Sequence, residues 1–157
     1  MTNDIAGIAD TGLSPGGSTL APMTNTTAIP SPSGAPVTWF EIGTDDPAAA
    51  RSFYGELFGW RFTAEGPYTL VSTVEGDEPS GGIQDTSTPQ PDGMPHSYAV
   101  PYVQVRDVAA TCARVEQLGG KVLVPATTAP NGIVVAHMTD PAGNHVGLWT
   151  PPPAAAT

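Results

Sequence analysis

Two stretches of the chain resemble one another, and this weak internal repeat constrains the fold more than any other feature. They are DDPAAARSFYGELFGWRF (45–62) and RDVAATCARVEQLGGKVL (106–123), with Asp46 aligned on Asp107 at an offset of 61. Each stretch has an aspartate suited to cap a helix, then apolar residues at helical spacing, then glycine. A repeated supersecondary unit cannot bury its sheet face alone, so the two copies are expected to pair, within one chain or across a dimer.

Strand-like segments surround each predicted helix. In the first copy they cover 37–43 before the helix and 60–64, 68–74 and 80–84 after it; in the second they cover 98–105, then 121–124, 133–138 and 144–150. This order predicts an α+β fold of two tandem βαβββ modules that form curved mixed sheets around a cavity. The modules are expected at about 36–86 and 95–151 within one domain (36–151), joined by DTSTPQPDGMP (85–95).

Both ends of the chain have a different composition from this domain. Residues 1–35 are rich in Ser, Thr, Gly, Pro and Ala and show no periodicity, which predicts a flexible extension. The alternative is that Ile5, Ile8 or Leu13 packs on a partner subunit. Residues 152–157 are predicted to form a loose C-terminal tail.

The charge balance limits the partners of the chain. A formal net charge of −10 disfavours nucleic acid and anionic membrane surfaces, because both are negatively charged. No apolar run approaches the roughly 18 residues needed to cross a bilayer, and no signal peptide is recognised. Cys112 is the single cysteine, so no intrachain disulfide can form. A cytoplasmic location is the expectation.

Three further motifs make the resemblance to a known family specific. The helix exit FYGELFGW (53–60), the segment LGGKV (118–122) and the closing turn DPAGN (140–144) resemble the vicinal oxygen chelate superfamily. That superfamily includes glyoxalase I, extradiol dioxygenases, methylmalonyl-CoA epimerase and the bleomycin and fosfomycin resistance proteins. The resemblance implies paired modules that curl around a cavity for a small molecule, and a homodimer. The Ala-, Pro-, Gly- and Thr-rich composition is typical of bacteria with a high GC content, where such proteins often accompany natural-product pathways.

Metal-binding members of that superfamily carry His, Gln or Glu on the first and last strand of each module. The resemblance places these positions at Trp39, Val100 and Gly147, with Gly82 or Gln84 as the fourth. Tryptophan, valine and glycine offer no side-chain lone pair suited to a divalent ion. We therefore expect no metal and no cofactor at these positions.

Residues two apart on a strand share a face, and this alternation predicts the lining of the cavity. The side chains expected there are Trp39, Glu41, Tyr98, Tyr102, His145 and Trp149. Gly147 would leave room among them for a flat ring. We predict catalytic roles for Glu41, His145 and Tyr98. Predicted ligand-binding residues are Trp39, Tyr102, Gly147, Trp149 and Gln84.

Several functions are compatible with such a cavity. It could sequester a small, largely apolar or aromatic molecule, such as a natural product or its precursor. It could also catalyse a metal-independent proton transfer of the isomerase, cyclase or hydrolase type, with Glu41 and His145 as acid and base. The alternative is a metal-dependent glyoxalase, epimerase or dioxygenase whose metal site has moved by two residues, so that Glu41 and His145 meet near Gln84 or Tyr98. A fourth possibility is a structural dimer with a collapsed cavity.

The other histidines and the single cysteine are expected to have structural rather than functional roles. His96 is expected to be exposed or to cap an element. A hairpin closed by residues 140–143 would place His137 opposite Val146, on the face packed against the helix. Cys112 is expected to be a buried, inert thiol on the packed face of the second helix.

Overall fold

A computed structural model describes residues 34–76 and 78–153. The extension predicted for 1–35 and the tail predicted for 152–157 therefore lie mostly outside the described residues. The first half of the described chain contains one helix and four strands. They are β1 (Val37–Thr44), α1 (Pro47–Phe58), β2 (Arg61–Glu65), β3 (Tyr68–Ser72) and β4 (Gly81–Asp85).

The second half has the same order of elements. They are β5 (Tyr98–Gln104), α2 (Val108–Gln117), β6 (Lys121–Thr128), β7 (Val134–Thr139) and β8 (His145–Thr150). Two helices and a mixed sheet of strands confirm the predicted α+β class.

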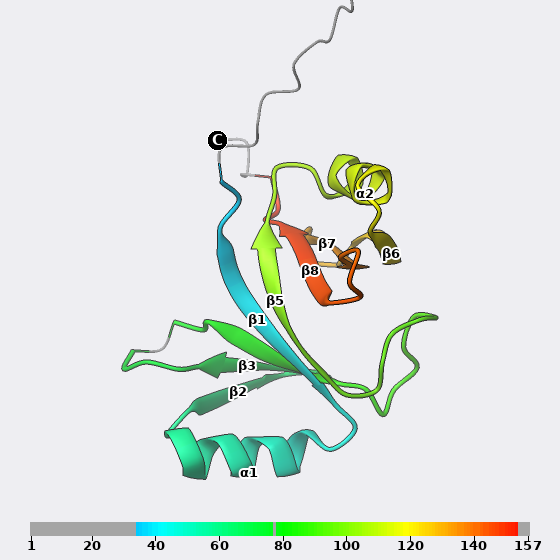
Figure 1. Ribbon diagram of the computed structural model, residues 1–157. Coiled ribbons are helices and arrows are strands. Elements are labelled where there is room, and N and C mark those ends of the chain that lie inside the picture. Colours follow the sequence, from blue (N-terminus) through cyan, green and yellow to red (C-terminus); the bar gives the residue numbers. More distant parts are fainter. Residues whose placement is uncertain (1–33, 77, 154–157) are drawn as a thin grey trace, which may run out of the picture. The chain divides into compact units, whose positions relative to one another are not determined.

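The eight strands of the described residues belong to one sheet with the order β2-β3-β4-β1-β5-β8-β7-β6. The first strand of each half pairs in parallel with the last strand of the same half, as β1 with β4 and β5 with β8. The two halves meet where β1 and β5 run antiparallel, side by side (Figure 1). Residues on β1, β5 and β8 consequently lie on adjacent strands although they are far apart in the sequence.

Both helices begin as the sequence predicts. The Asp46 carboxylate accepts a hydrogen bond from the amide of Ala49 (2.9 Å), and the Asp107 carboxylate accepts one from Ala110 (2.9 Å). Each satisfies an amide that the first helical turn leaves free. α1 ends at Gly59, whose φ of 70° lies in the left-handed region that favours glycine.

Helix α2 covers one face of β6, β7 and β8 and leaves the other face free for the site. The buried cluster there consists of Val108, Cys112, Ala136 and Leu148. The burial predicted for Cys112 is thereby confirmed. Since neighbouring strand residues point to opposite faces, Val135, His137 and Trp149 point away from α2.

Helix α1 packs differently from the expectation of a buried apolar stripe. Phe53 and Leu57, two of the apolar residues at helical spacing in this helix, are 59% and 58% exposed. Aromatic rings connect the helix to the sheet: Tyr54 stacks on Trp60 (5.2 Å between centroids), and Trp60 lies tilted against Phe40 of β1 (5.4 Å). Within the described residues, part of the apolar side of α1 is therefore exposed.

The described residues contain no helix long and apolar enough to cross a membrane.

Candidate functional site

The carboxyl group of Glu41 is the centre of the site. Trp39 and Glu41 lie two residues apart on β1, so both face the same cavity. Glu41 is only 8% exposed. A carboxyl group buried to this degree destabilises the fold unless hydrogen bonds replace its lost hydration.

Three tyrosine hydroxyls supply these hydrogen bonds. Tyr98 and Tyr102, both on β5, donate to Oε1 of Glu41 at 2.8 and 3.2 Å. Tyr68, the first residue of β3, donates to Oε2 at 3.0 Å. The Tyr68 oxygen in turn accepts the indole N–H of Trp39 at 3.1 Å, which orients its own hydrogen toward the carboxylate. The cluster thus offers donors to both carboxylate oxygens.

Each of these tyrosine rings lies across a glycine of the neighbouring strand. A Cβ at any of the three glycines would come within 3.0 Å of the ring, closer than side chains normally approach. The three pairs are Tyr98 with Gly43, Tyr68 with Gly82, and Tyr102 with Gly147. These glycines let the rings lie close to the sheet, so that the hydroxyls converge on Glu41.

The chain positions of Glu41 and Tyr102 are related by the repeat, since the two residues are separated by its offset of 61. Glu41 pairs with Gly82 across the parallel strands of the first half, and Tyr102 pairs with Gly147 across those of the second. At equivalent positions, each half therefore has a polar side chain paired with a glycine: Glu41 in the first half and Tyr102 in the second. The Tyr102 hydroxyl donates its hydrogen bond to the Glu41 carboxylate.

Burial determines the proton affinities of this cluster. It raises the pKa of Glu41, and the hydrogen bonds from Tyr98, Tyr68 and Tyr102 oppose that rise in part. The pKa values of the three tyrosines are also raised, first by burial and then by the nearby Glu41 charge. The tyrosines therefore keep their protons, and the carboxyl is the group in the cluster that can exchange one.

Two histidines extend the hydrogen-bonded network beyond Tyr102. The Tyr102 oxygen lies 3.0 Å from Nε2 of His137, and Nδ1 of His137 lies 2.9 Å from Nε2 of His145. Nδ1 of His145 is buried and has no hydrogen-bond partner among the described residues. Burial lowers the pKa of His145, and burial followed by the proximity of His145 lowers that of His137 to about 4.

The prediction that His137 faces the helix is wrong, because the pairing of β7 with β8 is shifted by one residue from the expected register. His137 pairs with Gly147 rather than Val146, because the turn between β7 and β8 also contains Asn144. The Asp140 carboxylate accepts hydrogen bonds from the Asn144 amide and side chain (2.9 and 2.7 Å), which keeps Asn144 in the turn. A slip of one residue moves a side chain to the other face of a strand. His137 consequently faces the cavity.

The cavity has a volume of about 650 Å³, a size suited to a small organic molecule. Its polar end is formed by Glu41, the three tyrosines and His137. Much of its wall is apolar, including Val124, Ile133 and Val135 on the β6–β7 side. The segment between β4 and β5, interpreted from sequence only as a linker, adds further wall residues: Pro89, Pro91 and Met94.

Six of the eight predicted site residues line this cavity. They are Trp39, Glu41, Gln84, Tyr98, Tyr102 and Trp149. His145 joins the network through His137, and Gly147 lies beneath the Tyr102 ring; neither belongs to the described lining. The roles predicted for the eight residues remain predictions.

Sequence reasoning missed Tyr68 and His137. Tyr68 follows a Gly-Pro turn at the start of a short strand, and Gly82 on the paired strand is the only sequence signal for its position. For His137, the available signal is Asn144, which follows the Asp-Pro turn. Its side chain can donate a hydrogen bond to Asp140, which indicates a turn one residue longer.

The described residues do not fit a divalent cation. Trp39, Val100 and Gly147 occupy three positions at which the family resemblance implies ligands. Within residues 34–76 and 78–153, no three His, Cys, Asp or Glu side chains are grouped to hold a metal. Glu41 and His145 do not converge, because Tyr102 and His137 connect them in a chain.

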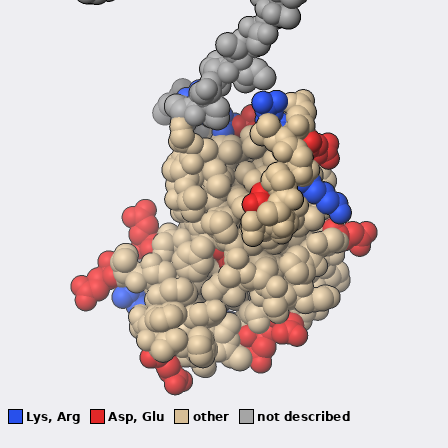
Figure 2. Space-filling model, in the orientation of Figure 1, with Lys and Arg blue, Asp and Glu red and all other residues tan. Residues whose placement is uncertain are grey.

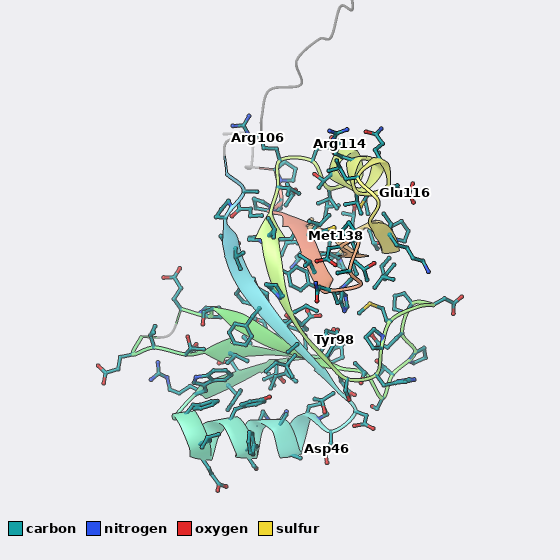
Figure 3. The ribbon with its side chains drawn as sticks, viewed as in Figure 1. Asp46, Tyr98, Arg106, Arg114, Glu116 and Met138 are labelled. Carbon is teal, nitrogen blue, oxygen red and sulfur yellow. The ribbon has the colours of Figure 1, made fainter. Side chains whose placement is uncertain are left out.

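Basic side chains lie away from the cavity. Among the described residues, no lysine or arginine contributes to its lining. Arg106 and Arg114 lie near the end of the ribbon that carries α2, apart from Tyr98 (Figure 3). The face in Figure 2 is largely uncharged, and most of the acidic and basic side chains visible on it lie near its edge. The described lining therefore offers no lysine or arginine side chain to bind a phosphate or carboxylate of a ligand.

Comparisons with known proteins agree with this architecture. The Glyoxalase/Bleomycin resistance protein/Dioxygenase superfamily matches residues 37–148. CFP32 of Mycobacterium bovis, whose name places it among glyoxylases, is 34% identical over 117 residues, covering 71% of this chain and 44% of that protein. The anthracycline biosynthesis protein DnrV of Streptomyces peucetius is 33% identical over 130 residues, covering 74% of this chain and 46% of that protein. The chain spans less than half the length of these curated relatives.

A solved structure shares the fold. Methylmalonyl-CoA epimerase from Mycobacterium tuberculosis superposes with a TM-score of 0.50 at 17% identity, covering 75% of this chain and 90% of that chain. With the family match over residues 37–148, the chain belongs to the Glyoxalase/Bleomycin resistance protein/Dioxygenase superfamily. The predicted membership is confirmed.

Proposed function

We propose that this protein binds a small, uncharged, largely apolar molecule in its cavity and moves a proton on that molecule without a metal. The observation that carries the proposal is the buried carboxyl of Glu41, held by three tyrosine hydroxyls in the wall of a cavity with a largely apolar lining. Burial raises the pKa of Glu41, so its carboxylate takes up a proton more readily than an exposed one.

The proton transfer requires only groups already in the site. Ionised Glu41 removes a proton from a carbon next to a carbonyl, and the electron pair of the broken C–H bond moves to the carbonyl oxygen. The neutral carboxyl no longer needs all three donors, so Tyr98 can turn its hydroxyl to the new oxyanion. In a ligand with a carbon–carbon double bond next to the ionised carbon, the electron pair also extends over that double bond, and return of the proton to its far carbon completes an isomerisation with no added reactant.

The charge of the cavity limits the ligand class. Glu41 is an anion when ionised, and no cationic lysine or arginine side chain of the described residues lines the wall. An anionic ligand would meet repulsion without a compensating partner. The aromatic residues Trp39 and Trp149 offer flat surfaces to a ring. A neutral ligand with an aromatic part and one carbonyl or phenol oxygen matches this arrangement.

A second candidate, sequestration without turnover, is favoured by the apolar walls alone. The similarity to an anthracycline biosynthesis protein supports a polycyclic aromatic ligand under either candidate. The two candidates differ in whether Glu41 is needed for chemistry or only for binding.

Two measurements with matched variants separate these candidates. N-phenyl-1-naphthylamine, a neutral fluorophore, is expected to bind, whereas its sulfonated analogue 1-anilinonaphthalene-8-sulfonate binds much more weakly. Neutral aryl ketones incubated with the protein in D2O should lose their α-proton NMR signal. Glu41→Gln should reduce this exchange by about 100-fold or more and retain binding. The exposed Glu116→Gln is the control.

The outcomes are distinct. Equal exchange in wild type and Glu41→Gln contradicts the role of Glu41. Binding of the neutral fluorophore with no exchange for any ketone favours sequestration. Absence of binding contradicts both candidates.

We further propose that the chain forms a homodimer in the cytoplasm. Support comes from the exposed Phe53, Leu57 and Phe58 of α1, which are 59%, 58% and 55% exposed. A two-fold pair would let this apolar face cover itself. Light scattering after size exclusion should give twice the monomer mass, and Leu57→Glu should give the monomer mass.

A further inference from the structure

The hydrogen bonds from Glu41 to His145 form one unbroken chain. It passes from Oε1 of Glu41 to the Tyr102 hydroxyl (3.2 Å), to Nε2 of His137 (3.0 Å), and from Nδ1 of His137 to Nε2 of His145 (2.9 Å). Every intermediate atom in this chain can both accept and release a proton. We infer that Tyr102, His137 and His145 form a proton relay that connects the carboxyl of Glu41 with Nδ1 of His145.

When Glu41 is ionised, the directions of the hydrogen bonds determine which nitrogen of each histidine in the relay carries a hydrogen. The carboxylate accepts the Tyr102 hydrogen, so the Tyr102 oxygen must accept N–H from Nε2 of His137. Nδ1 of His137 then has no hydrogen and accepts N–H from Nε2 of His145. Nδ1 of His145 is left as a bare lone pair, and it is the buried atom without a partner among the described residues.

One added proton reverses every bond of the chain. A proton that arrives at Nδ1 of His145 allows Nε2 of His145 to release its hydrogen to Nδ1 of His137. Nε2 of His137 then releases its hydrogen to Tyr102, and Tyr102 releases its own to Glu41. The result is a neutral carboxyl, two neutral imidazoles and an intact tyrosine. One proton enters at one end and one is held at the other, with no other reactant.

The surroundings of the two imidazoles suit this relay. Each must be neutral to carry one N–H and one lone pair, and burial lowers the pKa of both histidines, favouring the neutral form. His145 is outside the described cavity lining, whereas Glu41 is in it. In the proposed function, on which the use of the relay in turnover rests, the relay therefore places its second proton position, Nδ1 of His145, outside the cavity that holds the ligand.

The relay predicts a linked change of tautomer that needs no ligand. In protein labelled with ¹⁵N-histidine, long-range ¹H–¹⁵N NMR identifies the protonated nitrogen of each imidazole. His137 and His145 should always share one tautomer: both Nε2–H when Glu41 is ionised and both Nδ1–H when it is neutral. They should change together as the ¹³C signal of the Glu41 carboxyl reports protonation. The exposed His96, the third histidine of the chain, is the internal reference.

Two variants test the connection through Tyr102. Tyr102→Phe should leave Glu41 titrating but abolish the response of both histidines. Tyr98→Phe is the matched control, because Tyr98 also donates to Oε1 of Glu41 without a hydrogen bond to His137 among the described residues; the response should persist there. Amide spectra establish that each variant is folded, and the wild-type titration tests the relay if Tyr102→Phe is not.

Different tautomers on His137 and His145 would overturn the relay, as would a fixed tautomer while Glu41 takes up a proton. A response that survives Tyr102→Phe would overturn it too. The readout uses the free protein, so failure of the relay leaves the ketone exchange of the proposed function intact. Absence of ketone exchange, conversely, leaves the tautomer result unaffected.

Discussion

The ring of Tyr102 lies against Gly147 on the adjacent strand β8, where a Cβ would be 2.5 Å from the ring. From its position on the strand alone, Gly147 is expected to leave room for the flat ring of a ligand. In the structure a ring of the protein's own occupies that room. Gly147 thus allows the Tyr102 hydroxyl to reach both Glu41 and His137.

This contact predicts the effect of a methyl group at position 147. Gly147→Ala should displace the Tyr102 ring and lower the free energy of unfolding by about 1–3 kcal/mol, the usual cost of overpacking. Urea denaturation measures the change. Gly34→Ala is the control, because a Cβ there meets nothing within 4 Å. Equal stability of Gly147→Ala and wild type would show that the ring can move aside freely.

Burial of Glu41 predicts a stability difference that depends on pH. Because the folded-state pKa is raised above its unfolded value, the folded state binds this proton more tightly, and stability falls as pH rises through the raised pKa. Glu41→Gln lacks this proton, so its stability relative to wild type should increase with pH. The slope is at most about 1.4 kcal/mol per pH unit between the two pKa values. A pH-independent difference in urea denaturation would contradict the raised pKa.

His137 predicts the opposite dependence. Its pKa is about 4 in the folded protein against 6.5 for the unperturbed group, so the unfolded chain binds the proton more tightly. Stability contributed by neutral His137 should be lost as pH falls from 6.5 through about 4, by on the order of 3 kcal/mol. His137→Gln should lack this loss in acid denaturation, whereas His96→Gln, at an exposed position, should retain it.

Much of the fold could be predicted from local chemistry, and the errors came from pairing between strands. Asp46 and Asp107 marked both helix starts, and alternation along strands placed Glu41, Tyr98 and Tyr102 on one face. The number of residues in the β7–β8 turn decided the face of His137, and hydrogen bonds of Asn144 set that number.

Tyr68 shows a further limit of sequence reasoning. It reaches Glu41 because β4 lies between β3 and β1 in the sheet, with Tyr68 paired to Gln84 and Glu41 paired to Gly82. The parallel pairing of β1 with β4 joins residues 41 positions apart in the chain, such as Glu41 and Gly82, and no local pattern specifies it. The exposure of the apolar side of α1 could not be predicted either. Helical periodicity identifies an apolar face, but it does not indicate which surface covers that face.

Removal of a single hydroxyl tests whether the tyrosines stabilise the anionic form of Glu41. Tyr68→Phe leaves Oε2 of the carboxylate without the donor at 3.0 Å. A hydrogen bond to a charged group contributes about 1.5–3 kcal/mol, so the anion should be disfavoured and the pKa of Glu41 should rise above its wild-type value. The ¹³C carboxyl titration of Glu41 reports the change. Tyr54→Phe is the control, because Tyr54 stacks on Trp60 and no hydrogen bond joins it to Glu41 in the described structure. A lower or unchanged pKa in Tyr68→Phe would mean that the hydroxyl stabilises the neutral carboxyl at least as well as the anion. Glu41 would then be held as an acid rather than as a base, and the direction of the proposed proton transfer would have to be reversed.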